Sequence, residues 1–365
     1  MIKRFFLLAL CSSLLTLFAV APVHAAPAGA IGDDFIYIVE PGDNLSQLAD
    51  LYTTSSQTWR HLQTRNQIDN ELTLPIGKQL KIPFSMIPVV ATTAELVHTQ
   101  GPVWVNDQPV RPTQPLKSGD VIRTGTHGFA TLQLEDQTTL SLPNNSQLAI
   151  QHLNAFERAH LTDTILELQA GSVESRVAPD NAGVGRFEIH TPVSVTGVRG
   201  TDLRIHTEAG MATTELLSGK AHFNTATQSY QNLSASHGVS IKPDGSSHVT
   251  LLLAAPTLGG VEHGPQGWYT TLQPVPKADH YVVQISLDAA GTQVVKRYEV
   301  PADEQTILLS SSGAGEHFAF IRAVDETGLM GMNAQLAFAG QLTLSATDGS
   351  TVSSGFGPPV LLTQY

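Results

Sequence analysis

Histidines and carboxylates are the residues of this chain that could support hydrolytic chemistry. Fourteen histidines suggest zinc binding, but they are scattered, and no His-x-His or His-Glu-x-x-His spacing occurs. Glu174 and Asp202 could act as a glycosidase-like pair, since two such carboxylates need only meet in space, although no motif surrounds either of them. No Gly-x-Ser-x-Gly elbow or phosphate-binding loop occurs. The sequence therefore predicts no catalytic residue, no metal ligand and no cofactor, and a hydrolase stays open as the least favoured alternative.

The first residues have the order expected of a secretory signal peptide. Lys3 and Arg4 form a short positive region, residues 5–20 are largely apolar, and small or compact residues end at Ala25. We expect cleavage after Ala25. The alternative is an uncleaved membrane anchor, but the apolar run is short for a span of roughly 20 residues.

Cysteine usage and charge narrow the class of protein further. The only cysteine, Cys11, lies in the predicted signal peptide. A lipoprotein signal has a small residue just before its cysteine, whereas Leu10 stands there in this chain, so we do not expect lipidation. The mature chain would then have no disulfide and no nucleophilic thiol. The chain has 20 basic and 32 acidic residues, so its formal net charge is −12. Loss of Lys3 and Arg4 with the signal leaves 18 basic against 32 acidic residues, a net charge of −14. We therefore expect no nucleic-acid partner, no stable membrane span after cleavage, and a periplasmic or secreted location.

Residues 37–83 show the pattern of strand, Gly-Asp turn, two helices, turn and strand. Asn44 can cap a helix that begins at Leu45, and Gln47 is placed for a capping-box exchange. The apolar positions of this first helix share one face and are Leu45, Leu48, Ala49 and Tyr52. This spacing alone would also fit a two-helix, two-strand mini-domain without any sugar site.

This stretch, YIVEPGDNLSQLADLY through LPIGKQLKIP, resembles a LysM domain, a module that binds N-acetylglucosamine polymers such as peptidoglycan. The resemblance implies a shallow groove between two loops, where backbone groups bond the N-acetyl group and apolar side chains cover its methyl. Asn44 replaces the usual threonine, and Ser46 a bulkier residue. The implied glycan-binding residues are Gly42, Asp43, Asn44, Leu45, Leu74, Pro75, Ile76 and Gly77.

Short alternating runs broken by turn residues fill residues 94–244, where the helix period is almost absent. Ala130 and Leu132, for example, point to one face while their neighbours point to the other. This pattern predicts one mainly β domain. Residues 167–173 and 215–221 echo each other, and each indicates a strand that reaches a glycine and continues into another strand. An extended connector is expected just before this region, at 85–93.

Turn glycines of this region form a signature, Gly119-Asp120 with Ile122-Arg123-Thr124-Gly125, and Val198-Arg199-Gly200-Thr201. The signature resembles a FecR-type domain. The named member of that family is a periplasmic sensor that signals to a sigma factor through a membrane span and a cytoplasmic segment. We expect neither in this chain, so the resemblance implies the fold rather than the signalling role. Arg199 is interpreted as structural.

Residues 251–340 are a third β-rich segment. Strand candidates separated by turn residues lie at 281–285, 305–309 and 318–323. With Trp268 on an early strand and Tyr281 on a central one, the segment resembles a fibronectin type III-like sandwich, which implies a spacer or a partner surface. Residues 341–365, rich in serine, threonine and glycine, are interpreted as a loosely ordered tail.

The predicted fold class is therefore mainly β, with a small βααβ LysM module, a β-rich FecR-type domain and a C-terminal β-sandwich. The predicted boundaries are a signal peptide at 1–25, the LysM module at 36–84, the FecR-type domain at 94–244, the sandwich at 251–340 and the tail at 341–365. The predicted function is non-catalytic binding of peptidoglycan, with the β domains presented to an envelope protein partner. An envelope regulator or sensor acting through the FecR-type domain is the alternative.

Overall fold

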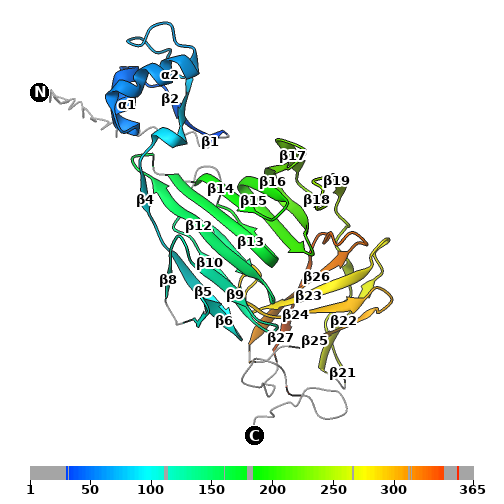
Figure 1. Cartoon of the computed structure of the whole chain (residues 1–365). Coiled ribbons are helices and arrows are strands. Elements are labelled where there is room, and N and C mark those ends of the chain that lie inside the picture. The colour runs from blue at the N-terminus through cyan, green and yellow to red at the C-terminus, as the bar shows by residue number, and fades with distance from the viewer. Residues whose placement is uncertain are drawn as a thin grey trace, which may run out of the picture.

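The computed structural model describes residues 30–31, 33–110, 114–159, 161–178, 184–264, 267–310, 313, 315–340 and 352. The predicted signal peptide and, apart from Val352, the predicted tail lie outside the described residues, as does the side chain of Arg199. Strands dominate the described chain, which confirms the mainly β fold class. Three parts follow one another through the molecule, from the small helical unit to the carboxyl-terminal sheets (Figure 1).

The first part is the predicted βααβ unit. Its elements are β1 (Ala30–Ile31), β2 (Asp34–Ile38), α1 (Leu45–Tyr52), η1 (Ser56–Thr58), α2 (Trp59–Asn66) and β3 (Gln79–Pro83). Strand β2 pairs antiparallel with β3. The side-chain oxygen of Asn44 accepts a hydrogen bond from the Gln47 backbone N–H at 3.0 Å, which confirms the predicted cap. The helix then buries Leu45, Leu48 and Ala49 against the sheet.

This unit shares an apolar core with the sheet that follows it. The Phe84 ring stacks on Phe156, with ring centroids 4.2 Å apart, and Ala159 and Leu161 belong to the same buried cluster. Arg158 Nη1 donates to the backbone carbonyls of Asp50 and Leu51 at the end of α1, at 2.9 and 3.2 Å. The two parts are therefore packed together.

The predicted connector contributes to this joint. It contains most of η2 (Phe84–Met86) and all of β4 (Val89–Ala91), and β4 pairs antiparallel with β12 (Gln147–Phe156). The segment is extended at β4, as predicted, but it forms part of the sheet. The chain therefore passes from the first part to the second through paired backbone.

The second part is one large, mainly antiparallel sheet whose apolar face forms the largest core of the protein. Besides β4 and β12, its strands are β5 (Ala94–Gln100), β6 (Val103–Val105), β7 (Gln108–Pro109), β8 (Pro115–Leu116), β9 (Val121–Thr124), β10 (Phe129–Gln133), β11 (Thr139–Leu142), β13 (Leu161–Arg176), β14 (Val184–His190), β15 (Ser194–Glu208), β16 (Met211–Thr225), β17 (Gln231–Ser234), β18 (His237–Ile241) and β19 (Ser247–Leu251). Only the β13–β14 pair among these described strands is parallel.

The two glycines of the internal echo lie within single long strands. Strand β13 continues through Gly171 (φ +77°), and β16 continues through Gly219 (φ +85°). A side chain at Gly171 would meet the Asn145 carbonyl oxygen at 2.4 Å, so only glycine fits there. The sequence correctly placed a strand on each side of the glycine, and the structure shows that the two halves are one strand.

The third part consists of two four-stranded antiparallel sheets that enclose a common core, which confirms the predicted sandwich. One sheet contains β20 (Thr257–Leu258), β21 (Glu262–Gly264), β22 (Gly267–Gln273) and β25 (Thr306–Leu309), and the other contains β23 (His280–Ser286), β24 (Val294–Pro301), β26 (Glu316–Val324) and β27 (Ala334–Ala339). Tyr281 is fully buried, and its hydroxyl accepts from the Val275 backbone N–H at 2.8 Å. Trp268 is half-buried against the same core.

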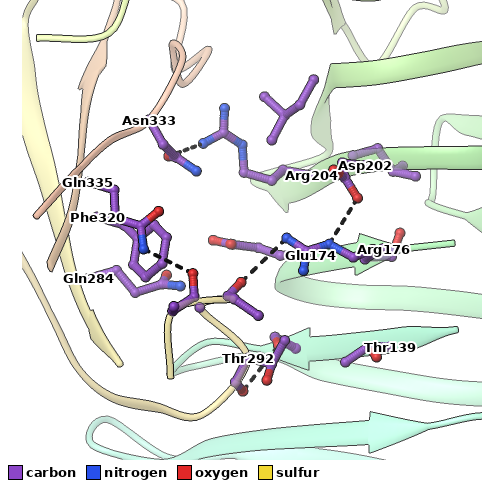
Figure 2. A pocket seen from close by; sticks show the side chains of 17 residues that line it. Thr139, Glu174, Arg176, Asp202, Arg204, Gln284, Thr292, Phe320, Asn333 and Gln335 are labelled. Atoms are coloured by element: carbon purple, nitrogen blue, oxygen red, sulfur yellow. Dashed lines mark hydrogen bonds and ion pairs between the residues drawn. The ribbon is translucent and has the colours of Figure 1, made fainter. Parts of the chain in front are cut away.

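Charged side chains join the sandwich to the large sheet. The cluster comprises Glu174, Arg204, Glu215, Arg297 and Arg322, and is called the interdomain charge cluster below. Arg322 Nη2 donates to Glu174 Oε1 at 2.5 Å across the joint. Arg204 Nη2 donates to the backbone carbonyls of residues 330 and 331 at 2.9 and 2.6 Å. Its Nη1 donates to the Asn333 side chain at 3.2 Å, as Figure 2 shows. Because an unpaired buried charge is costly, these contacts hold the two parts together.

The apolar joint predicts that a change outside the first unit destabilises that unit. Phe156→Ala leaves the residues of that unit unchanged but removes the ring that stacks on Phe84, and we expect it to cost about 3 kcal/mol or more. Hydrogen exchange should show faster exchange at the buried amides of β2 and β3. The control is Tyr230→Ala, which removes a ring that is 55% exposed and should change stability little. Unchanged protection in Phe156→Ala would show that the first unit folds independently of the sheet.

The charge cluster predicts a specific sensitivity to acid. Burial alone would raise the pKa of Glu174, but the guanidinium groups of Arg322 and Arg297 outweigh burial and hold this pKa at about 2. The unfolded chain has a glutamate pKa of about 4.3, so the stabilisation is present above that pH and is lost as pH falls towards 2. Between pH 5 and pH 2 the wild type should lose about 3 kcal/mol more than Glu174→Gln, measured by denaturant unfolding of the sandwich and large sheet.

The matched control for this acid effect is Glu208→Gln, whose native side chain is 82% exposed. It should follow the wild type, because this carboxylate lies outside the cluster. Burial raises the pKa of Glu215, which opposes the acid effect, but Glu215 is present in all three proteins and cancels in the comparison. An equal acid response of wild type and Glu174→Gln would contradict the assignment.

Candidate functional site

The two loops expected to form the glycan groove lie side by side in the structure. The Leu45 backbone N–H donates to the Glu71 carbonyl at 3.1 Å, which ties the start of α1 to the second loop. The Gly77 N–H donates to the Val39 carbonyl at 2.8 Å. Gly42 (φ +96°) and Gly77 (φ +79°) both adopt backbone angles that favour glycine, with no atom crowding either position. The sequence therefore fixes two tight turns next to each other.

The polar side chains of the first loop are used to shape it. Asp43 Oδ2 accepts from the Tyr37 hydroxyl at 2.9 Å and from the Glu40 backbone N–H at 2.7 Å. Burial, followed by the hydrogen bond to Asp43, raises the pKa of Tyr37, so this hydroxyl remains a donor. The Asn44 side chain caps α1. Because both side chains have internal partners, the loop offers mainly backbone groups to a ligand.

The apolar residues of the two loops fall into a buried group and an exposed group. Leu45 and Leu74 are 0% and 9% exposed and belong to the core beneath the loops. Ile76 is 69% exposed, and Gly42, Pro75 and Gly77 are also exposed. The structure thus brings the eight predicted residues into one region but gives them different roles. Four lie at the surface, two shape the first loop and two support it from below.

Leu72 is a candidate that the sequence reasoning missed. Its side chain is 70% exposed on the same loop as Ile76. An exposed apolar side chain beside the predicted surface can add contact area for a sugar face. The available signal was its position within the second loop, two residues before Leu74.

The alternative catalytic carboxylates, Glu174 and Asp202, line one cavity of about 240 Å³ between the large sheet and the sandwich (Figure 2). Each has an arginine partner, since Arg322 binds Glu174 and Arg176 Nε donates to Asp202 Oδ1 at 3.2 Å. A glycosidase needs one carboxyl with a raised pKa as the acid. Glu174 has the opposite shift, which disfavours that role.

Residues of the FecR-type signature form structural contacts. Asp120 Oδ1 and Oδ2 accept from the Asn106 side chain at 2.8 Å and the Lys117 N–H at 2.9 Å, and these bonds shape the turn at Gly119. Arg123 lies over the Trp104 ring, 4.3 Å from its centroid. Within the described ranges no group of three histidine, cysteine or carboxylate side chains is arranged to hold a metal, and no helix is long and apolar enough to cross a membrane.

Comparisons with known proteins identify two regions of the chain. A family model described as LysM domain matches residues 37–83, and one described as FecR protein matches residues 120–222. No curated protein matches the chain. Two crystal structures of a proposed anti-sigma factor from Parabacteroides distasonis ATCC 8503, at 1.65 and 2.50 Å resolution, each align with 15% identity and a TM-score of 0.30. Each alignment covers 36% of this chain and 59% of that one, and at this TM-score it supports no conclusion.

The two family matches agree with the predicted order of domains. The first spans both loops of the candidate groove, and the second begins at Asp120 and ends within β16. The fibronectin type III likeness of the sandwich stays a prediction. The chain therefore carries a LysM domain followed by a FecR domain.

Proposed function

We propose that this protein is a non-catalytic envelope protein that holds peptidoglycan in its LysM groove. The observation that carries the proposal is the adjacency of two turns within the LysM match, with exposed Ile76 and Pro75 above the buried Leu45 and Leu74. LysM domains bind glycans that contain N-acetylglucosamine. Free backbone groups of the turns would bond the N-acetyl group, while the apolar surface would cover its methyl. Gly42, Asp43, Asn44, Leu45, Leu74, Pro75, Ile76 and Gly77 would form or support this site.

The absence of catalysis is part of the same proposal. LysM and FecR are families of binding and regulatory domains, and they support an envelope-associated role. We place the protein in the periplasm or outside the cell, after cleavage following Ala25, and we retain the predicted boundaries 36–84, 94–244 and 251–340. Zymography of the full chain on peptidoglycan should give no lytic band.

The large sheet and the sandwich would together present a surface to an envelope protein partner. The interdomain charge cluster supports this, because it docks the two parts in one arrangement. The FecR match over residues 120–222 also favours a second candidate function, that of an envelope regulator. In that case the LysM domain would place the FecR domain at the wall, and the partner would receive a signal.

Ile76→Asp tests the groove most cleanly. Ile76 is 69% exposed, so the substitution should change the free energy of unfolding by less than about 0.5 kcal/mol. It places a charge where an apolar surface is proposed, and retention on purified sacculi should fall about tenfold in a sedimentation assay. The control Val97→Asp changes a residue that is 50% exposed on the FecR domain and should be retained like the wild type. Full retention of Ile76→Asp would show that the groove lies elsewhere or is unused.

Asp43→Ala tests the support of the groove. The substitution removes the acceptor of the Tyr37 hydroxyl and the Glu40 N–H, and hydrogen bonds to a charged group contribute about 1.5–3 kcal/mol each. We expect lower LysM stability together with weaker sacculus retention, while the sandwich keeps its protection in hydrogen exchange. Tyr37→Phe should show a smaller effect, because Glu40 keeps its bond. Weaker retention with unchanged LysM stability would mean that Asp43 contacts the glycan directly.

A further inference from the structure

The interdomain charge cluster is not balanced. It holds three guanidinium groups against two carboxylates, and the side chains of Arg204, Arg322 and Glu215 are at most 1% exposed. The side chains of Arg297 and Glu174 are 14% and 18% exposed. A buried charge without a counter-charge is costly, since its desolvation is not repaid by attraction. The cluster therefore has one cation more than its carboxylates neutralise.

Arg297 is the least satisfied of the three arginines. Its Nη2 donates only to the thioether sulfur of Met330 at 3.5 Å, and sulfur is a weak acceptor. Its Nη1 lies 3.6 Å from Glu174 Oε1 and makes no hydrogen bond. That same oxygen already accepts from Arg322. Arg204 and Arg322, in contrast, donate to oxygen atoms of neighbouring residues.

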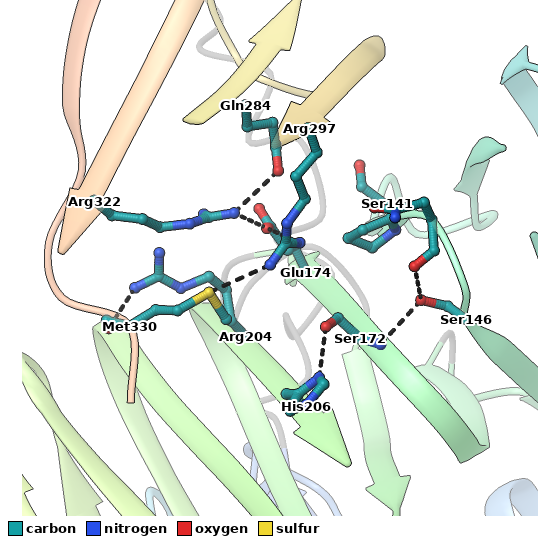
Figure 3. A network of polar contacts seen from close by, with 12 residues as sticks. Ser141, Ser146, Ser172, Glu174, Arg204, His206, Gln284, Arg297, Arg322 and Met330 are labelled. Carbon is teal, nitrogen blue, oxygen red and sulfur yellow. Dashed lines mark hydrogen bonds and ion pairs between the residues drawn. The ribbon is translucent and has the colours of Figure 1, made fainter. Parts of the chain in front are cut away.

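Arg297 lines a cavity of about 580 Å³ on the joint between the large sheet and the sandwich. Ser172, His206 and His280 line it as well, and Ser172 Oγ lies 2.9 Å from His206 Nδ1. Figure 3 shows Arg297 beside Glu174 and Met330, with Ser172 and His206 in the same view. The acidic residues in the lining, Glu208 and Glu299, are exposed. The cavity is thus lined by a guanidinium group that shares its nearest carboxylate, Glu174, with Arg322.

We propose that this cavity binds an oxyanion, the carboxylate or phosphate group of a small soluble molecule, with Arg297 as its counter-charge. A guanidinium group binds carboxylate and phosphate oxygens through charge-assisted, often bidentate, hydrogen bonds. Water could satisfy the unpaired donor but would leave the extra charge uncompensated. Ser172 and His280 provide further polar contacts, with His280 Nδ1 also bound to Asp279 at 2.9 Å. His206 lies between Ser172 at 2.9 Å and Glu208 at 3.6 Å, so it shapes the cavity wall. The site lies between the FecR domain and the sandwich and does not depend on glycan binding by LysM.

The test is isothermal titration of the full mature chain with succinate, with inorganic phosphate, and with 1,4-butanediol as the uncharged match of succinate. At least one anion should bind saturably at one site, and the diol should not. The tighter of the two anions identifies the group that the site takes. Arg297→Gln should weaken binding about tenfold or more. Arg176→Gln, which removes a half-exposed cation lining the other cavity, should change the affinity less than twofold.

Glu174→Gln separates anion binding from a merely structural role. It removes a carboxylate from the cluster, so the excess of cations grows and anions should bind several-fold more tightly even if the joint is less stable. If Arg297→Gln does not fold, amide shifts of the wild type around residues 172, 206 and 297 on adding the anion replace it as the readout. Absence of saturable anion binding, equal weakening by Arg176→Gln, or weaker binding by Glu174→Gln would overturn the proposal.

Discussion

The apolar contact between the LysM domain and the turn that links β12 to β13 is the interaction on which the rest of the structure depends. A module of this size buries little surface, and small exported domains often compensate with disulfides. The only cysteine of this chain is Cys11. The LysM core is instead completed by Phe156, Ala159 and Leu161, and Arg158 caps the end of α1. The proposed glycan groove would therefore owe part of its stability to residues outside the module.

This dependence has a mechanical consequence. The residues beneath the groove, Leu45 and Leu74, belong to the same buried cluster as Phe156. A glycan held by the loops would thus be held in a fixed orientation relative to the large sheet. The sandwich is held to the large sheet at the other end by ion pairs and hydrogen bonds of buried arginines, beside a packing contact between Leu329 and Gly238. The two joints respond to different conditions, since acid weakens ion pairs without weakening an apolar stack. Shallow sugar sites bind weakly one at a time, so retention on a polymer would gain from many attached copies.

Local signals explain what could be predicted from the sequence. The Asn44 cap and the glycine turns at Gly42 and Gly77 depend on residues a few positions apart, and the structure contains them. Alternation in β10 correctly placed Ala130 and Leu132 in the core, but Thr131 on the opposite face is buried as well, because the sandwich covers it. The helix period also placed Leu45 on an inward face, which explains why it supports the groove from below. The LysM and FecR resemblances gave the order of the two domains.

The contacts that join the parts could not be predicted in this way. Phe84 meets Phe156, and Glu174 meets Arg322, across long separations that leave no local pattern. A charged residue in an alternating strand normally faces solvent, so nothing distinguished Arg322 from an exposed arginine. The central claim remains the LysM groove. Its most direct measurement is an amide spectrum of the isotope-labelled full mature chain during titration with N-acetylglucosamine oligomers. The account predicts saturable shifts concentrated at the amides of residues 42–45, 72, 74, 76 and 77, whereas undisturbed amides there would contradict it.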